Sequence, residues 1–163
     1  MKKILQIADP YQVTLNHISK LEQICNTKFN IYEKVLLVNN GTTEQVLQVL
    51  LNTPTKIKVI RQNESNFIMR RESNIISNDK IKKVLSSAIS RIYVKRIPLE
   101  IINEIRLGRN GIGMIMMKYQ LETFKKILRI GYNSSKQNIF REYKLFHNYI
   151  NICDINETFV MRF

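Results

Sequence analysis

The stretch KIKVIRQ, residues 56–62, alternates polar and apolar side chains over most of its length. Alternation with a period of two predicts a β-strand with one buried and one solvated face. Residues 67–76 and 88–97 are rich in β-branched and aromatic side chains and are also compatible with strands. Residues 140–160 hold two more such runs, separated by NYIN at 148–151. The sequence therefore predicts a sheet built from the middle and the C-terminal part of the chain.

Helical patterns lie before and between these runs. In residues 13–24 apolar side chains recur at three-residue intervals, which predicts an amphipathic helix. Thr42 followed by Gln45 has the spacing of a capping box and predicts the start of a short apolar helix. Two further helices are expected at residues 99–107 and 121–130, because a glycine follows each of them.

The order of these elements is helices, strands, a helix and strands, without the strict alternation of a βαβ protein. This order favours an α+β fold in which helices pack against a mainly antiparallel sheet. A sheet covered on one side leaves room for a small ligand between the two layers. Because no internal repeat or linker-like segment occurs, we expect residues 1–163 to form a single domain.

The chain is strongly basic, with 26 Lys and Arg against 13 Asp and Glu and a formal net charge of +13. Such a charge attracts polyanions and small anions alike. Nucleic-acid-binding surfaces usually mix basic clusters with aromatic residues or glycine, whereas the densest basic groups here are the pairs 70–71 and 125–126. With 25 Ile, 17 Asn and 16 Lys but 2 Ala, the composition is also typical of an AT-rich genome. We therefore do not expect nucleic acid to be the main partner.

Several classes of protein and site are excluded by what the sequence lacks. The apolar runs, such as residues 114–117, are much shorter than the roughly 20 residues that span a membrane, so we expect no membrane association and no secretory signal peptide. Cys25 and Cys153 are too few for a disulfide framework and too far apart for a zinc motif, so we expect free thiols. His17 and His147 have no acidic or cysteine partner at ligand spacing, and we expect no metal site.

The glycine-rich segment GRNGIG, residues 108–113, is not a dinucleotide-binding motif. A Gly-x-Gly-x-x-Gly pattern that starts at Gly111 requires a third glycine at position 116, where Met116 stands. The sequence also contains no Gly-Lys-Ser/Thr phosphate loop and no Gly-x-Ser-x-Gly nucleophile elbow. We expect these glycines to form a tight turn that brings the backbone close to a neighbouring segment or a ligand.

Two charged positions stand out within predicted strands. Arg70 and Arg71 are neighbours in the run FIMRRE, and neighbouring side chains of a strand point to opposite faces, so one of them is expected to face inward. An inward arginine is costly unless it meets an anion, because its charge cannot be removed. Glu157 lies in a second such run near the C-terminal end. From spacing alone, a structural ion pair and an orientation toward water both remain open.

An ordered set of short motifs extends from about residue 36 to the end of the chain. It comprises Gly41-Thr42-Thr43 before an apolar helix, TKIKV at 55–59, Arg71, Ala88-Ile89-Ser90 with Pro98 after it, Gly111-Ile112-Gly113, Arg141-Glu142-Tyr143 and Glu157-Thr158-Phe159. In order and approximate spacing this set resembles the chorismate pyruvate-lyase (4-hydroxybenzoate synthase) family. The composition is similar to that of the small members encoded in algal plastid genomes.

This resemblance implies a six-stranded antiparallel sheet with helices on one side and an internal ligand cavity. It implies conversion of chorismate to 4-hydroxybenzoate and pyruvate without a cofactor. The carboxylate-binding arginine would be Arg71, or Arg70 if the register is shifted by one. The essential glutamate would be Glu157, acting as acid, base or hydroxyl partner. Further ligand contacts would come from Ile112 and from the backbone at Thr42.

Two other functions remain open at the level of the sequence. The same architecture serves as a non-catalytic sensor of small aromatic acids in certain transcription regulators. A basic accessory protein that binds nucleic acid is the other alternative, motivated by the charge of +13. The resemblance favours the lyase, located in the plastid stroma or the cytoplasm, and leaves the oligomeric state open.

Overall fold

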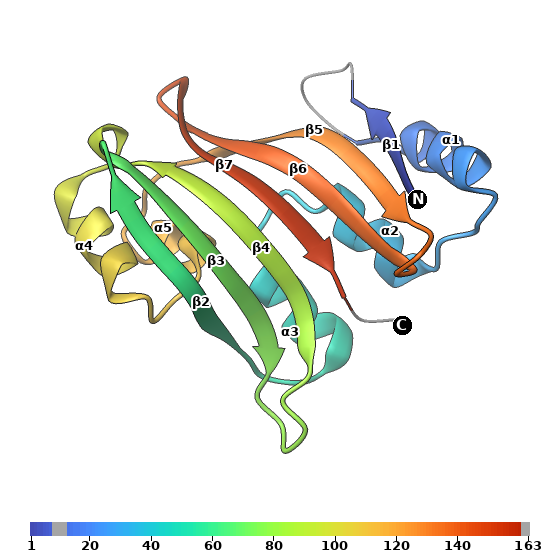
Figure 1. Ribbon diagram of the computed structural model, residues 1–163, viewed down its shortest axis with the longest axis horizontal. Helices are drawn as coiled ribbons and strands as arrows, with labels where there is room; N and C mark the ends of the chain where they lie inside the picture. The colour runs from blue at the N-terminus through green and yellow to red at the C-terminus, as the bar shows by residue number, and fades with distance from the viewer. Residues whose placement is uncertain (8–12, 161–163) are drawn as a thin grey trace.

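The computed structural model describes residues 1–7 and 13–160, and most of them form one antiparallel sheet with helices against it (Figure 1). The strands are β1 (Lys2–Gln6), β2 (Thr55–Ser65), β3 (Ile68–Ser77), β4 (Val84–Tyr93), β5 (Phe124–Asn133), β6 (Asn138–His147) and β7 (Ile150–Phe159). They lie in the order β1-β5-β6-β7-β4-β3-β2, and each adjacent pair is antiparallel. The helices are α1 (Leu15–Cys25), α2 (Ile31–Val38), α3 (Thr43–Leu51), α4 (Leu99–Leu107) and α5 (Ile112–Lys118), and η1 (Val94–Arg96) is a 3-10 turn.

The predicted α+β class with an antiparallel sheet is confirmed, but the expected number of six strands is wrong, because the described residues form a seven-stranded sheet. The short strand β1 at the edge was not predicted, since its five residues begin with two lysines and show little periodicity. It pairs with β5 through Lys2 opposite Asn133 to Gln6 opposite Arg129. Residues from the two ends of the chain therefore belong to the same sheet.

The predicted helix at residues 121–130 is wrong, because this segment contains most of strand β5. The register between β5 and β6 shifts between Ile127 and Arg129, which marks a β-bulge. The inserted residue separates the buried Ile127 and Ile130 by three positions instead of two, and this spacing imitates a helix. Gly131 is a strand residue here: a Cβ at this position would lie 2.6 Å from the carbonyl oxygen of Lys3.

Other predicted elements agree with the structure to within a few residues. The helix at 99–107 is confirmed as α4, and Gly108 ends it in the left-handed conformation with φ of 68°. The predicted strand at 88–97 begins four residues earlier and gives way to η1. Helices α2 and α5 were not predicted. The prediction of a capping box at Thr42 is wrong. The Thr42 hydroxyl bonds to the side chain of Gln45 at 2.6 Å and does not cap the backbone.

Alternation along the strands separates a covered face of the sheet from an exposed one. On β3, Met69 and Arg71 are buried while Arg70 between them is exposed. On β4, Ser90 and Ile92 are buried in the same way. Figure 1 shows α2, α3 and α5 behind the sheet, so the buried side chains face this helical layer. The covered face carries both the hydrophobic core and the polar groups described below.

The remaining expectations concern cysteines, histidines and membranes. Cys25 and Cys153 are both free thiols, and burial raises the pKa of Cys153. His17 bonds to Thr14, and His147 bonds to the carbonyl oxygen of Glu122. Within residues 1–7 and 13–160, no helix has the length and apolar character that a membrane crossing requires. In the same ranges, no three side chains of the metal-binding types come together.

Candidate functional site

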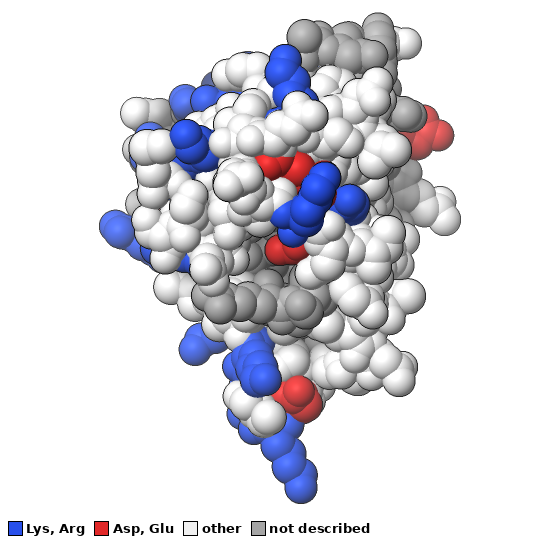
Figure 2. Space-filling view, turned by 90° about the vertical axis from the view of Figure 1, so that its right-hand side faces the viewer, with Lys and Arg blue, Asp and Glu red and all other residues white. Residues whose placement is uncertain are grey.

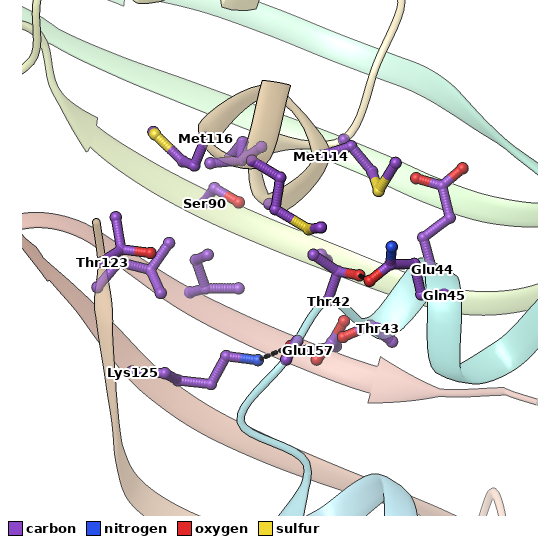
Figure 3. A pocket seen from close by; sticks show the side chains of 18 of the residues that line it. Thr42, Thr43, Glu44, Gln45, Ser90, Met114, Met116, Thr123, Lys125 and Glu157 are labelled. Carbon is purple, nitrogen blue, oxygen red and sulfur yellow. Dashed lines mark hydrogen bonds between the residues drawn. The ribbon is translucent and has the colours of Figure 1, made fainter. Parts of the chain in front are cut away.

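A pocket of about 470 Å³ lies between the covered face of the sheet and the N-terminal ends of α3 and α5. Figure 3 shows Thr42 to Gln45 on one side of it, Met114 and Met116 on another, and Lys125 and Glu157 extending from the sheet. The pocket is half open to solvent, in contrast to the enclosed cavity implied by the resemblance. Its walls mix apolar side chains, such as Ile57 and Ile112, with a few polar groups.

The two glycines that flank Ile112 allow α5 to approach α3 closely. A Cβ at Gly113 would lie 3.0 Å from Cγ2 of Thr42, and one at Gly111 would lie 3.2 Å from a carboxylate oxygen of Glu44. The two glycines at the start of α5 therefore let its backbone lie close to the side chains of Thr42 and Glu44. This segment forms one end of the pocket wall.

The floor of the pocket contains a buried ion pair between neighbouring strands. Arg141 on β6 lies directly opposite Glu157 on β7, and the exposed fractions of these residues are 0% and 3%. Nε and Nη2 of Arg141 each lie 2.9 Å from Oε2 of Glu157. The hydrogen bond between them is charge-assisted, which favours a fixed geometry of the carboxylate.

Arg141 uses its remaining donors to hold the helical layer. Nη1 donates to the carbonyl oxygens of Leu36 at 2.6 Å and Asn39 at 2.7 Å, and Nη2 donates to Oγ1 of Thr43 at 3.0 Å. These contacts tie the end of α2 and the start of α3 to the sheet. They leave no free N–H on the guanidinium, so Arg141 orients Glu157 rather than offering a binding group of its own.

Lys125 on β5 is a second buried cation of the pocket, with an exposed fraction of 8%. Its Nζ donates to the carbonyl oxygen of Gly41 at 2.7 Å, with the carbonyl oxygen of Asn39 at 3.5 Å, and lies 4.6 Å from the ring centroid of Tyr143. Within the described ranges no carboxylate forms an ion pair with it. Burial lowers the pKa of Lys125 to about 7, Arg141 adds to this effect, and Glu157 opposes it.

Arg71 on β3 is buried to 1% exposure and lies beside the pocket rather than in its lining. Its Nη2 donates to the carbonyl oxygen of Asn110 at 2.7 Å, whereas Nε and Nη1 are buried and have no hydrogen-bond partner within residues 1–7 and 13–160. Ser90, its neighbour on β4, and Ser73, two residues along β3, both line the pocket. The burial lowers the pKa of Arg71, yet an arginine stays charged at neutral pH.

Strand register relates Arg71 to Glu157 on the covered face. Arg71 lies opposite Ser90, and Glu157 lies opposite Ala88, which is two residues from Ser90 along β4. Two strand spacings across the sheet and two residues along it correspond to about 12 Å between the Cα atoms. Both side chains are buried on this face, so neither is turned outward into solvent.

The structure brings together some of the predicted site residues and adds others. Thr42, Ile112 and Glu157 line the pocket. The expectation that one arginine of the pair faces inward is confirmed, with Arg71 buried and Arg70 exposed. Lys125 was missed, because the wrongly predicted helix gave no reason for its side chain to be buried.

Arg141 appeared in the sequence only as part of a motif that carries the resemblance, with no role assigned to it. The signal that identifies it, its position opposite Glu157, depends on the pairing of β6 with β7.

One residue that the sequence did not single out, Glu44, lies at the edge of the pocket and is half-buried. Burial raises the pKa of its carboxyl group, and a hydrogen bond with Thr55 opposes this.

Basic side chains outside the pocket do not gather in one patch on the face seen in Figure 2. Lys and Arg residues occupy several separate places there, including the β3–β4 hairpin that projects at the bottom of the view. A nucleic-acid-binding surface usually forms a continuous basic stripe. This face therefore gives no support to the alternative of a nucleic-acid-binding protein.

Comparison of the chain with known proteins gives no family. No protein-family model matches it, and no curated protein sequence matches it.

Proposed function

We propose that this protein is a lyase that converts chorismate to 4-hydroxybenzoate and pyruvate without a cofactor. The observation that carries the proposal is the state of Arg71, a fully buried cation that has two unpartnered nitrogens and no ion pair with a carboxylate of the described residues. Burying an unpaired charge costs stability. An anionic ligand that bonds to Nε and Nη1 removes this cost, and the adjacent pocket has room for a substituted ring.

The arrangement of Arg71 and Glu157 suits a ring with polar groups at opposite ends. In the proposed complex the guanidinium of Arg71 binds the ring carboxylate, which enters beside Ser73 and Ser90. The hydroxyl at C4, para to that carboxylate, then faces the Glu157 oxygen that Arg141 does not hold. A benzene ring with a hydrogen bond at each end fits between two side chains whose Cα atoms are about 12 Å apart.

The proposed reaction requires mainly that the enzyme positions the substrate and stabilises the charge of the departing group. The proton at C4 leaves, its electron pair forms the third double bond of the ring, and the C3–O bond breaks to release enolpyruvate. Protonation of the enolpyruvate methylene then gives pyruvate. Aromatisation supplies the driving force, so catalysis consists mainly of orienting the substrate and stabilising the departing anion. Glu157 either accepts the C4 proton or holds the C4 hydroxyl.

The apolar walls fit this proposal as well. Ile112 and Met116, together with Ile57, offer a nonpolar surface to the ring faces, while the start of α3 at Thr42 offers backbone N–H groups. The pocket is half open to solvent, which gives the substrate a route of entry. For a lyase of this kind, we expect the protein to act in the plastid stroma or the cytoplasm.

The test is to incubate the purified protein with chorismate and to measure 4-hydroxybenzoate and pyruvate in equal amounts. We expect Arg71→Ala and Glu157→Ala each to reduce turnover at least about a hundredfold, because each removes a charged contact to the reacting ring. Arg70→Ala is the matched control, because it removes the exposed arginine directly before Arg71. We expect this variant to keep the activity. A protein that neither converts chorismate nor binds 4-hydroxybenzoate would refute the proposal, whereas binding without turnover would favour a sensor.

A further inference from the structure

The covered face of the sheet near the pocket holds more buried positive than negative charge. Arg71, Lys125 and Arg141 are buried cations there, and Glu157 is the buried carboxylate. Arg141 and Glu157 neutralise each other, which leaves Arg71 and Lys125 without a counter-ion among the described residues. Glu44 is only half-buried at the edge of the pocket, so solvent screens it.

We infer that Lys125 forms a second anion subsite, which binds the carboxylate of the enolpyruvyl group while Arg71 binds the carboxylate of the ring. This inference rests on the proposed function and deepens it, because it assigns one cation to each charge of a dianionic substrate. It extends the recognition of the substrate to a residue on β5, which is separated from β3 by the three strands β6, β7 and β4.

The geometry around Lys125 leaves one donor for such a ligand. An ammonium group has three N–H donors, and the carbonyl oxygens of Gly41 and Asn39 account for two of them. The Tyr143 ring at 4.6 Å supports the cation from one side, and the pocket lies on another. Figure 3 shows the Lys125 side chain extending across the pocket floor toward the segment before α3.

Glu157 does not serve as the partner of Lys125. Its Oε2 already receives the two contacts from Arg141, and no ion pair joins its carboxylate to Nζ of Lys125. A carboxylate supplied by a ligand is therefore the missing counter-ion. The product 4-hydroxybenzoate lacks this second carboxylate, so its binding does not depend on Lys125.

The experiment compares two unreactive probes by titration calorimetry. The dianion is 3-(carboxymethoxy)-4-hydroxybenzoate, and the matched monoanion is 4-hydroxy-3-methoxybenzoate. We expect the wild-type protein to prefer the dianion, and Lys125→Met to weaken dianion binding by about tenfold or more while leaving the monoanion within about twofold. Lys126→Met removes a charge from the other face of the same strand and is expected to leave both affinities unchanged.

A purely structural role of Lys125, in which it only fixes the loop at Gly41, predicts that Lys125→Met weakens both probes equally. That result would overturn the subsite, as would a wild-type protein that binds the two probes equally well or binds neither. Because neither probe reacts, the outcome is independent of turnover. Preference for the dianion without conversion of chorismate would refute the lyase alone, and turnover unaffected by Lys125→Met would refute the subsite alone.

Discussion

Arg141 and Glu157 lie directly opposite each other on β6 and β7, and both are buried, with Nε and Nη2 of the arginine 2.9 Å from the same carboxylate oxygen. The arginine also binds Leu36 and Asn39 through their carbonyl oxygens. One side chain thus joins the floor of the pocket to the segment that forms its wall. Its loss has consequences for both stability and the position of Glu157.

We expect Arg141→Met to lower the free energy of unfolding by about 3–5 kcal/mol, because it leaves the Glu157 carboxylate buried without a partner. Urea unfolding followed by circular dichroism measures this change. The double variant Arg141→Met with Glu157→Leu is expected to recover a large part of the loss, since it removes both charges. A double variant whose loss equals the sum of the two single losses would show that the ion pair contributes no coupling.

Arg71→Met is expected to behave in the opposite way. Replacing a buried guanidinium that has two unpartnered nitrogens by an apolar side chain leaves stability unchanged or raises it by about 1–3 kcal/mol. The same variant is expected to lose turnover, because its ligand-binding charge is gone. Unfolding in urea and chorismate turnover are measured on the same preparation. A clear loss of stability would mean that the hydrogen bond from Arg71 to Asn110 outweighs the cost of the buried charge.

The contribution of Lys125 to the stability of the protein is expected to rise with pH between about 7 and 10. Burial lowers the pKa of Lys125 to about 7, whereas an unfolded lysine titrates near its ordinary value of about 10.4. Over this window the unfolded state binds more protons than the folded state, so the free energy of unfolding gains about 1 kcal/mol per pH unit from this group. Below pH 7 both states are protonated and the cost of the buried charge is fully present.

Urea unfolding at a series of pH values checks this prediction by comparing the wild type with Lys125→Met. The variant is expected to be more stable at pH 6 and to lose this part of the rise with pH. Lys126→Met, whose side chain lies on the opposite face of β5, is expected to keep the wild-type slope. Parallel curves for the wild type and Lys125→Met would contradict the lowered pKa.

Gly131→Ala is expected to destabilise the edge of the sheet. A Cβ at this position would lie 2.6 Å from the carbonyl oxygen of Lys3 and would also collide with the ring of Phe140. We expect a loss of about 1–3 kcal/mol, because overpacking forces the neighbours to shift. Hydrogen exchange of β1 amides, together with urea unfolding, measures this effect. Gly41→Ala, at a more open position, serves as the control.

Features that depend on a few neighbouring residues were predicted correctly, whereas features that depend on how strands pair were not. Helix α4 and the inward position of one arginine were predicted correctly, because each depends on periodicity or on a terminating glycine within a few residues. Strand β5 was predicted as a helix, because the bulge between Ile127 and Arg129 changes the local period. The contribution of β1 to the sheet was missed, since an edge strand needs only a partner and not a strong pattern of its own.

By itself the sequence determined the α+β class, the antiparallel sheet and the residue types available for binding an anion. Only the tertiary structure decided which of these charges meet. The pairing of Arg141 with Glu157 depends on the register between β6 and β7, and the burial of Lys125 depends on a loop that lies more than eighty residues away in the chain. Among the described residues Arg71 forms no ion pair, for the same reason. Local periodicity is encoded by neighbouring residues, whereas the balance of buried charge arises only when distant strands are placed side by side.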